Sequence, residues 1–170
     1  MKRLFVFFTL IACFPTHGLE EIVKKYDWRT KTTKVYSDIT PKRGNPRLVL
    51  STAYSGKKFG GTSPLVYFGF VSIANPLDRK FHACNATTFL LDGRPFSPGD
   101  AVYKKVDVYK KGDYLDYVLE MLGYPKVTFS VIKMLAMATK IEVKICDTIF
   151  TLTAEEMKDL KKFVRLFTPE

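Results

Sequence analysis

His82 and Cys84, in the stretch FHACNATT, are the first residues whose types suggest chemistry, because a cysteine beside a histidine can act as a nucleophile with its base. Two positions apart on a strand, their side chains lie on one face and run parallel rather than toward each other. Cys84 is also expected to be oxidised in an exported protein. We therefore interpret His82 as a structural residue and predict no catalytic dyad.

The remaining polar residues lack the spacing of common metal and nucleotide sites. A structural zinc site takes four ligands, usually as two closely spaced pairs, and the chain has three cysteines and two histidines with no CxxC motif. The motifs GxxxxGK[ST], GxSxG and HExxH do not occur in the sequence. We predict no metal and no cofactor, and we favour a protein that is not an enzyme.

Three carboxylates, Asp113, Asp116 and Glu120, support an alternative in which the protein is a small exported hydrolase. If residues 113–122 form a helix, the three share one face and can supply an acid and a base. If the segment is a strand, the cluster loosens and the carboxylates are solvated beside Lys110 and Lys111. The sequence leaves the choice between helix and strand open.

The elements that would position these residues are mostly strands from Arg47 onward. The stretch LVYFGFVSI is apolar on both faces, which is typical of a central strand. Its residues 68–71 (FGFV) match part of an RNA-recognition signature, but the basic residue and the final aromatic of that signature are missing, so we expect no nucleic-acid partner. Further strands are predicted at RLVLSTAY, KFHACNATTFLL, AVYKKVDVY, YLDYVLEML (with the helical alternative above), IEVKI and TIFTL.

Two helices are predicted in the C-terminal half, at TFSVIKMLAMATK and after Thr153. Thr153 and Glu156 fit a capping box, in which each side chain accepts a hydrogen bond from the other residue's backbone N–H. The second helix is amphipathic, with four basic residues on its outer face. The pattern predicts an α+β fold: a mostly antiparallel sheet of about six to seven strands with both helices packed on one face.

The N-terminus has the features of an export signal, namely a cationic start at Lys2 and Arg3 and an apolar run from Leu4. We expect cleavage after residue 18 and no transmembrane helix thereafter, since the run is too short to span a bilayer. An alternative is a lipoprotein signal in which Cys13 is lipidated and anchors a structural protein to the envelope. After the signal, residues 19–46 suggest an arm or a short helix plus a loop, and residues 47–170 a single domain.

Cys84 and Cys146 remain as an even pair once residues 1–18 are removed. In the periplasm or outside the cell such a pair is expected to form a disulfide. The long loop that the bond closes is worth about 4 kcal/mol in the chain-entropy model.

A strong positive charge is the main clue to a partner. The net charge is +10, and lysines recur beside tyrosines, a pairing suited to a protein surface or to an anionic component of an envelope or matrix. We therefore expect an exported binding module whose ligand the sequence does not identify. The candidate binding residues are Tyr103, Lys104, Lys105, Tyr109, Lys110 and Lys111.

Overall fold

The computed structural model describes residues 21–38, 45–60, 64–75, 79, 81, 86–111 and 114–168. In these parts the chain forms ten strands and two helices, and all strand pairs are antiparallel. Both helices lie in the C-terminal half. The predicted α+β class is therefore confirmed, although the strands number ten in two sheets rather than six or seven in one.

Six strands form the larger sheet, with β4 (Val66–Ala74) between β3 and β8. Most β4 residues on both faces are buried, which confirms the central strand predicted from its apolar sequence. The strand order is β1 (Glu21–Asp27), β2 (Thr32–Asp38), β3 (Arg47–Ser55), β4, β8 (Tyr114–Val127) and β7 (Val102–Lys111).

Four shorter strands form the second sheet. The predicted hairpin across Cys146 and Asp147 is confirmed, because Thr148 pairs with Ile145. A second hairpin turns at Asp92 and Gly93, which both have positive φ angles, as an Asp-Gly type I′ turn requires. The strand order is β10 (Thr148–Thr151), β9 (Ile141–Ile145), β5 (Thr87–Leu91) and β6 (Arg94–Phe96).

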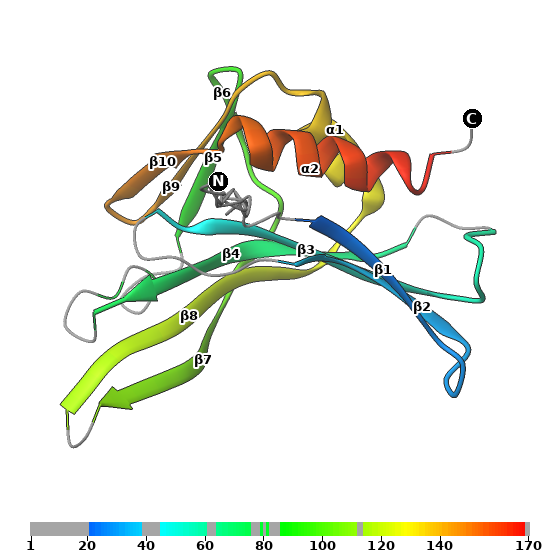
Figure 1. Cartoon of the computed structure of the whole chain (residues 1–170). Helices are drawn as coiled ribbons and strands as arrows, with labels where there is room; N and C mark the ends of the chain where they lie inside the picture. Colours follow the sequence, from blue (N-terminus) through cyan, green and yellow to red (C-terminus); the bar gives the residue numbers. More distant parts are fainter. Residues whose placement is uncertain are drawn as a thin grey trace, which may run out of the picture.

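The helices α1 (Phe129–Met137) and α2 (Ala154–Arg165) and the smaller sheet lie on the same side of the six-stranded sheet (Figure 1). The core fills the space between these layers, where rings from both sheets meet. The Phe70 ring lies edge-on to Phe150, with centroids 5.1 Å apart, and 6.0 Å from the Phe89 ring. Such pairs contribute about 0.5–1.5 kcal/mol beyond their buried area.

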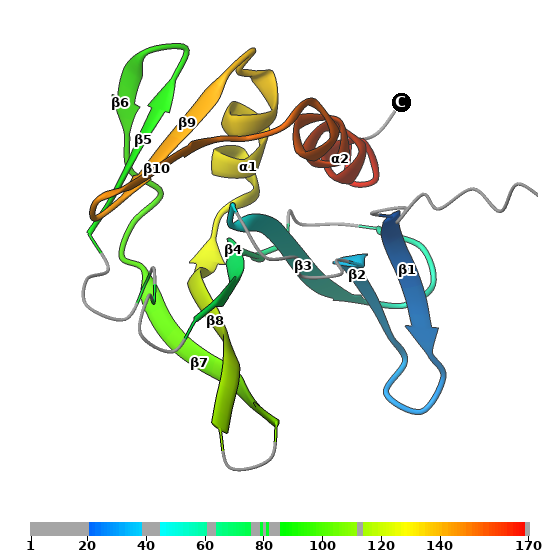
Figure 2. The same ribbon diagram turned by 60° about the vertical axis from the view of Figure 1, so that its left-hand side comes forward.

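The β1–β2 and β7–β8 hairpins extend away from the helices, and Figure 2 shows the same arrangement from a second direction. The described residues include no helix that is long and apolar enough to cross a membrane.

Residues 21–38 form the β1–β2 hairpin, so the short helix suggested for the N-terminal segment is wrong. Ile22 and Val35 are buried on the inner face of this hairpin, and β2 pairs with β3 from Thr32↔Ser55 to Tyr36↔Ser51. Pairing with an existing strand edge and burial against the core outweigh the weak local helix preference of this segment.

Asp92 connects the β5–β6 turn to the segment between α1 and β9. Its carboxylate accepts hydrogen bonds from the Thr139 hydroxyl, from Lys140 N–H at 2.9 Å and from Thr139 N–H at 3.0 Å. In the other direction, Asp92 N–H donates to the Lys140 carbonyl at 3.0 Å. These bonds hold the smaller sheet against the end of α1.

Replacing Asp92 with asparagine is expected to lower the melting temperature at neutral pH, but progressively less below about pH 4. The hydrogen bond from the Thr139 side chain, followed by that from Lys140 N–H, lowers the pKa of Asp92. A carboxyl group with a lowered folded-state pKa stabilises the fold above its unfolded-state pKa, and this contribution disappears as the pH falls through the folded-state pKa. Thermal unfolding of both proteins across the acid range measures the difference.

Asp147→Asn is the matched control, because it removes the same charge from an exposed residue in the neighbouring β9–β10 turn. We expect it to have the smaller effect at neutral pH. An Asp92→Asn effect that is equally large at pH 2.5 and pH 7 would contradict a role for the ionised carboxylate.

Candidate anion-binding groove

Helix α2 presents a row of cations on its outer face, as the sequence predicts. The capping box is present: the Thr153 hydroxyl accepts from Glu156 N–H at 3.2 Å, and Glu156 Oε2 accepts from Thr153 N–H at 2.8 Å. Leu160 and Phe163 are fully buried and fix the rotation of the helix. The residues that this rotation leaves outside include Lys158, Lys161, Lys162 and Arg165, and each of these lies three or four positions from two of the others.

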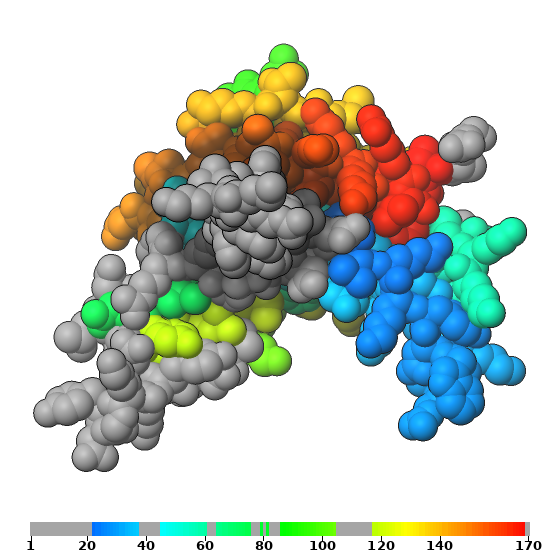
Figure 3. Space-filling model, viewed as in Figure 1, coloured from blue at the N-terminus to red at the C-terminus, as the bar shows by residue number. Residues whose placement is uncertain are grey.

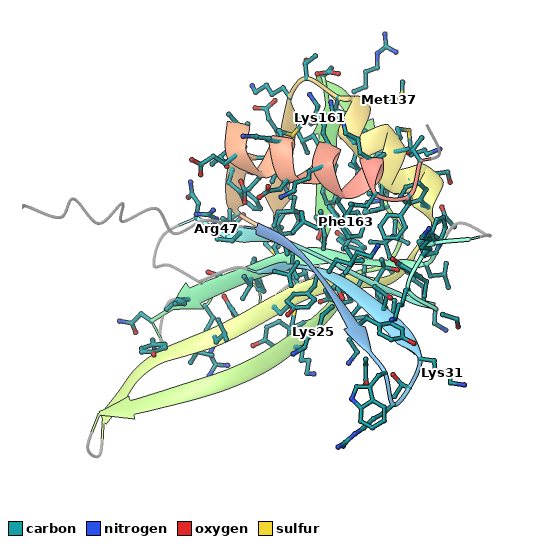
Figure 4. The ribbon with its side chains drawn as sticks, turned by 45° about the vertical axis from the view of Figure 1, so that its right-hand side comes forward. Lys25, Lys31, Arg47, Met137, Lys161 and Phe163 are labelled. Atoms are coloured by element: carbon teal, nitrogen blue, oxygen red, sulfur yellow. The ribbon has the colours of Figure 1, made fainter. Side chains whose placement is uncertain are left out.

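This row forms one wall of a groove of about 630 Å³. Figure 4 shows Lys161 on the outward side of α2 and Phe163 on the side toward the sheet. The remaining lining residues are Thr139, Lys140, Leu152, Ala154 and Met157, so the groove combines five cations with an apolar surface and has no carboxylate in its lining.

The charges along α2 are only partly balanced. Within the described part of the chain, no carboxylate lies within ion-pair distance of Lys158, Lys161, Lys162 or Arg165. Like charges three and four apart on a helix disfavour folding by a few tenths of a kcal/mol per pair. Lys162 and Arg165 lie in the last turn, where the helix dipole favours cations, but Lys158 and Lys161 do not.

Two acidic residues near the groove, Glu142 and Asp159, affect the charge that its cations present. Lys140 Nζ lies 3.1 Å from Glu142 Oε1, so one of the five cations is paired. Burial raises the pKa of Asp159, against the opposing effect of Lys162 and Lys158. Four cations of the groove therefore remain available to an anionic ligand.

The binding residues predicted from the sequence lie elsewhere, on β7. Lys104 is exposed, whereas Tyr103 is half-buried and packs against the core, so this pair does not form one surface. The side chains of four other predicted residues, Lys105, Tyr109, Lys110 and Lys111, lie outside the described part of the structure.

Two of the three carboxylates of the hydrolase alternative, Asp116 and Glu120, lie on a strand rather than on a helix. The segment after the turn is strand β8, and the Glu120 side chain is fully buried. The β7–β8 ladder passes from Tyr109↔Tyr117 to Lys110↔Leu115, which makes Asp116 the extra residue of a bulge. Asp113 lies outside the described residues. The predicted alternative in which residues 113–122 form a helix with the three carboxylates on one face is therefore wrong.

Only one of the two cysteines of the predicted disulfide, Cys146, lies in the described part of the chain. Cys146 is disulfide-bonded, and its N–H donates to the Ala86 carbonyl at 3.1 Å. This hydrogen bond brings the β9–β10 turn next to the start of β5. Its acceptor, Ala86, follows position 84 by two residues in the sequence. Cys84 and Cys13 lie outside the described residues, so the Cys84–Cys146 pairing and the lipidation of Cys13 stay predictions.

The groove was missed from the sequence although its cations were assigned to the outer face of the helix. The missing information was the position of Thr139 and Lys140, which precede β9 in the chain and also line the groove. Among the described residues, no group of three His, Cys, Asp or Glu side chains is placed to hold a metal ion.

Comparisons of the chain with protein-family models, curated proteins and solved structures find no match.

Proposed function

We propose that this protein is an exported, non-enzymatic binding module, and that the groove beside α2 holds an anionic segment of a cell-envelope or matrix component. The observation that carries this proposal is the lining of the groove, with five cations and no carboxylate. An anionic ligand would relieve the repulsion among the α2 cations, which costs the free protein stability.

The dimensions of the row favour an extended ligand. From Lys158 to Arg165 the helix rises by about 10 Å at 1.5 Å per residue. A chain with repeated anionic groups, such as an acidic glycan, could contact several cations of this row in turn. Leu152 and Met157 offer apolar contacts to its backbone.

Replacing Lys158, Lys161, Lys162 and Arg165 with glutamine is expected to weaken binding to heparin, used as a model sulfated glycan, by about 30-fold. The estimate takes four surface charge contacts at about 0.5 kcal/mol each. Binding should be measured by titration at fixed ionic strength, because screening weakens exposed charge contacts.

A second quadruple variant provides the control. Changing Lys104, Lys105, Lys110 and Lys111 on β7 to glutamine lowers the net charge by the same amount. We expect this variant to retain most of the affinity. If both variants lose affinity equally, heparin senses net charge rather than the groove, and the proposed site is wrong.

A further inference from the structure

The turn of the β1–β2 hairpin exposes Trp28, the one tryptophan of the chain. Its side chain is 73% exposed, although indole is among the largest apolar groups in proteins. The hairpin projects from the body of the molecule on the side away from α2 (Figures 1 and 3). An exposed tryptophan at the tip of a projecting hairpin is well placed to meet a partner.

The turn that carries Trp28 is held in place by hydrogen bonds. Asp27 Oδ1 accepts from Arg29 N–H at 2.9 Å, and the Thr32 hydroxyl donates to the Thr30 carbonyl at 3.1 Å. Gly56 N–H donates to the Lys31 carbonyl at 2.8 Å, which ties the turn to the end of β3. The indole is therefore presented on an ordered support, which lowers the entropic cost of binding.

Cations lie beside aromatic rings at the turn and along the hairpin. The Arg29 guanidinium lies 5.3 Å from the Trp28 ring centroid, and Lys57 Nζ lies 5.4 Å from that of Tyr26. Lys25 and Lys34 are exposed and directly opposite each other in the ladder, an arrangement of like charges that destabilises a sheet. Figure 4 shows Lys25 on this hairpin and Lys31 at its turn.

Negative charge near the tip is limited to one described side chain, Asp27. Its carboxylate is engaged with the backbone of the turn, and the hydrogen bond from Arg29 N–H is the largest cause that lowers its pKa. The tip therefore combines an exposed aromatic ring with an excess of positive charge.

The β7–β8 hairpin ends on the same side of the molecule (Figures 1 and 2). Its last described pairs in the β7–β8 ladder are Lys110↔Leu115 and Lys111↔Tyr114.

We propose that the β1–β2 hairpin docks on an anionic phospholipid membrane, with Trp28 in the headgroup region and Lys25, Arg29, Lys31 and Lys34 above it. Indole rings favour the membrane–water interface, and each lysine or arginine near an anionic surface adds to the attraction. This surface lies away from the α2 groove, so the protein could contact a membrane and the groove ligand together.

The experiment uses the protein as the cell exports it, with its N-terminus identified by intact mass. Vesicles of phosphatidylcholine alone are compared with vesicles containing phosphatidylglycerol. We expect binding to the anionic vesicles only, together with a blue shift of the tryptophan emission and quenching by brominated lipid. Because Trp28 is the single tryptophan, both signals report on the hairpin tip. A lipid anchor at Cys13 would instead bind both kinds of vesicle.

Variants then test which residues carry the binding. Trp28→Ala should weaken vesicle binding about tenfold, from partial burial of the ring. The pair Lys25→Gln and Lys34→Gln should weaken it about 25-fold, at roughly fivefold per cation. The matched pair Lys158→Gln and Lys161→Gln on α2 should leave vesicle binding within about twofold, although it weakens heparin binding.

Two outcomes would overturn the membrane proposal. The first is vesicle binding without any change in Trp28 emission, since another surface would then make the contact. The second is an equal loss in the hairpin and α2 lysine pairs, since net charge would then explain the binding. If the α2 double variant loses heparin binding but keeps vesicle binding, the two proposals are tested independently, because each has its own variant and its own ligand.

Discussion

Replacing Glu156 with alanine is expected to lower the free energy of unfolding by about 3–4 kcal/mol, from a lost helix cap and a buried N–H left without its charged acceptor. For a domain of this size, that corresponds to a fall of about 6–16 °C in melting temperature. Chemical denaturation of the variant and the unchanged protein measures the difference in the free energy of unfolding. The slopes of that free energy against denaturant concentration should be compared as well.

The expected loss is large because Glu156 joins two parts of the fold that are distant in sequence. Its Oε2 atom accepts from Thr153 N–H and the Thr153 hydroxyl, and its Oε1 atom accepts from Leu48 N–H at 2.9 Å. Leu48 lies beyond the end of the β2–β3 pairing, so the carboxylate takes the place of a neighbouring strand. Arg47 Nε, 3.7 Å from Oε1, helps to balance the charge of this residue, which is only 4% exposed.

Glu155→Ala is the matched control, because it removes the same charge from an exposed position in the same helical turn. We expect this change to cost less than about 0.5 kcal/mol. Glu156→Gln should fall between the two, since an amide retains one carbonyl acceptor. Equal effects of the Glu155 and Glu156 alanine variants would falsify the structural role of the buried carboxylate.

Replacing Gly69 with alanine should lower the free energy of unfolding by about 3 kcal/mol through overpacking. A Cβ atom at this position would lie 2.6 Å from the Leu122 carbonyl oxygen and 2.8 Å from Gly123 Cα. Both atoms belong to the backbone of β8, directly across from β4 in the centre of the sheet. The sheet can relieve this contact only by separating the two strands.

Gly123→Ala offers a contrast, because the obstacle there is a side chain. A Cβ atom at Gly123 would overlap the ring and hydroxyl of Tyr67, which lies over this glycine. Burial of the Tyr67 ring also raises the pKa of its hydroxyl. Since a half-buried side chain can move more easily than a strand, we expect a smaller loss of about 1–2 kcal/mol.

A double-mutant cycle tests this explanation. In a Tyr67→Ala background, Gly123→Ala should become neutral or stabilising, because the ring is gone and alanine is less costly than glycine in a strand. The coupling between positions 67 and 123 should exceed about 1 kcal/mol. Gly69→Ala should remain destabilising in the same background, and its rescue there would contradict the backbone contact with β8.

Local sequence patterns correctly predict the secondary structure wherever a few neighbouring residues determine it. The capping box at Thr153 and Glu156, the alternation of IEVKI and the apolar stretch of β4 are such cases, and the structure confirms each. The sequence also places four cations on the outer face of the second helix and lysines near Trp28, and these residues belong to the two proposed binding surfaces.

Tertiary structure alone decided the elements whose form depends on distant partners. Residues 21–27 became a strand because β2 and β3 provided an edge and a core to bury Ile22, and β8 became a strand through pairing on both sides. The hydrogen bond from Leu48 N–H to the Glu156 carboxylate joins residues 108 positions apart. Thr139 and Lys140 line the α2 groove only because α1 and β9 bring the segment between them to it. Periodicity reports which face of an element is buried, but the partner that buries it is set by packing across the whole chain.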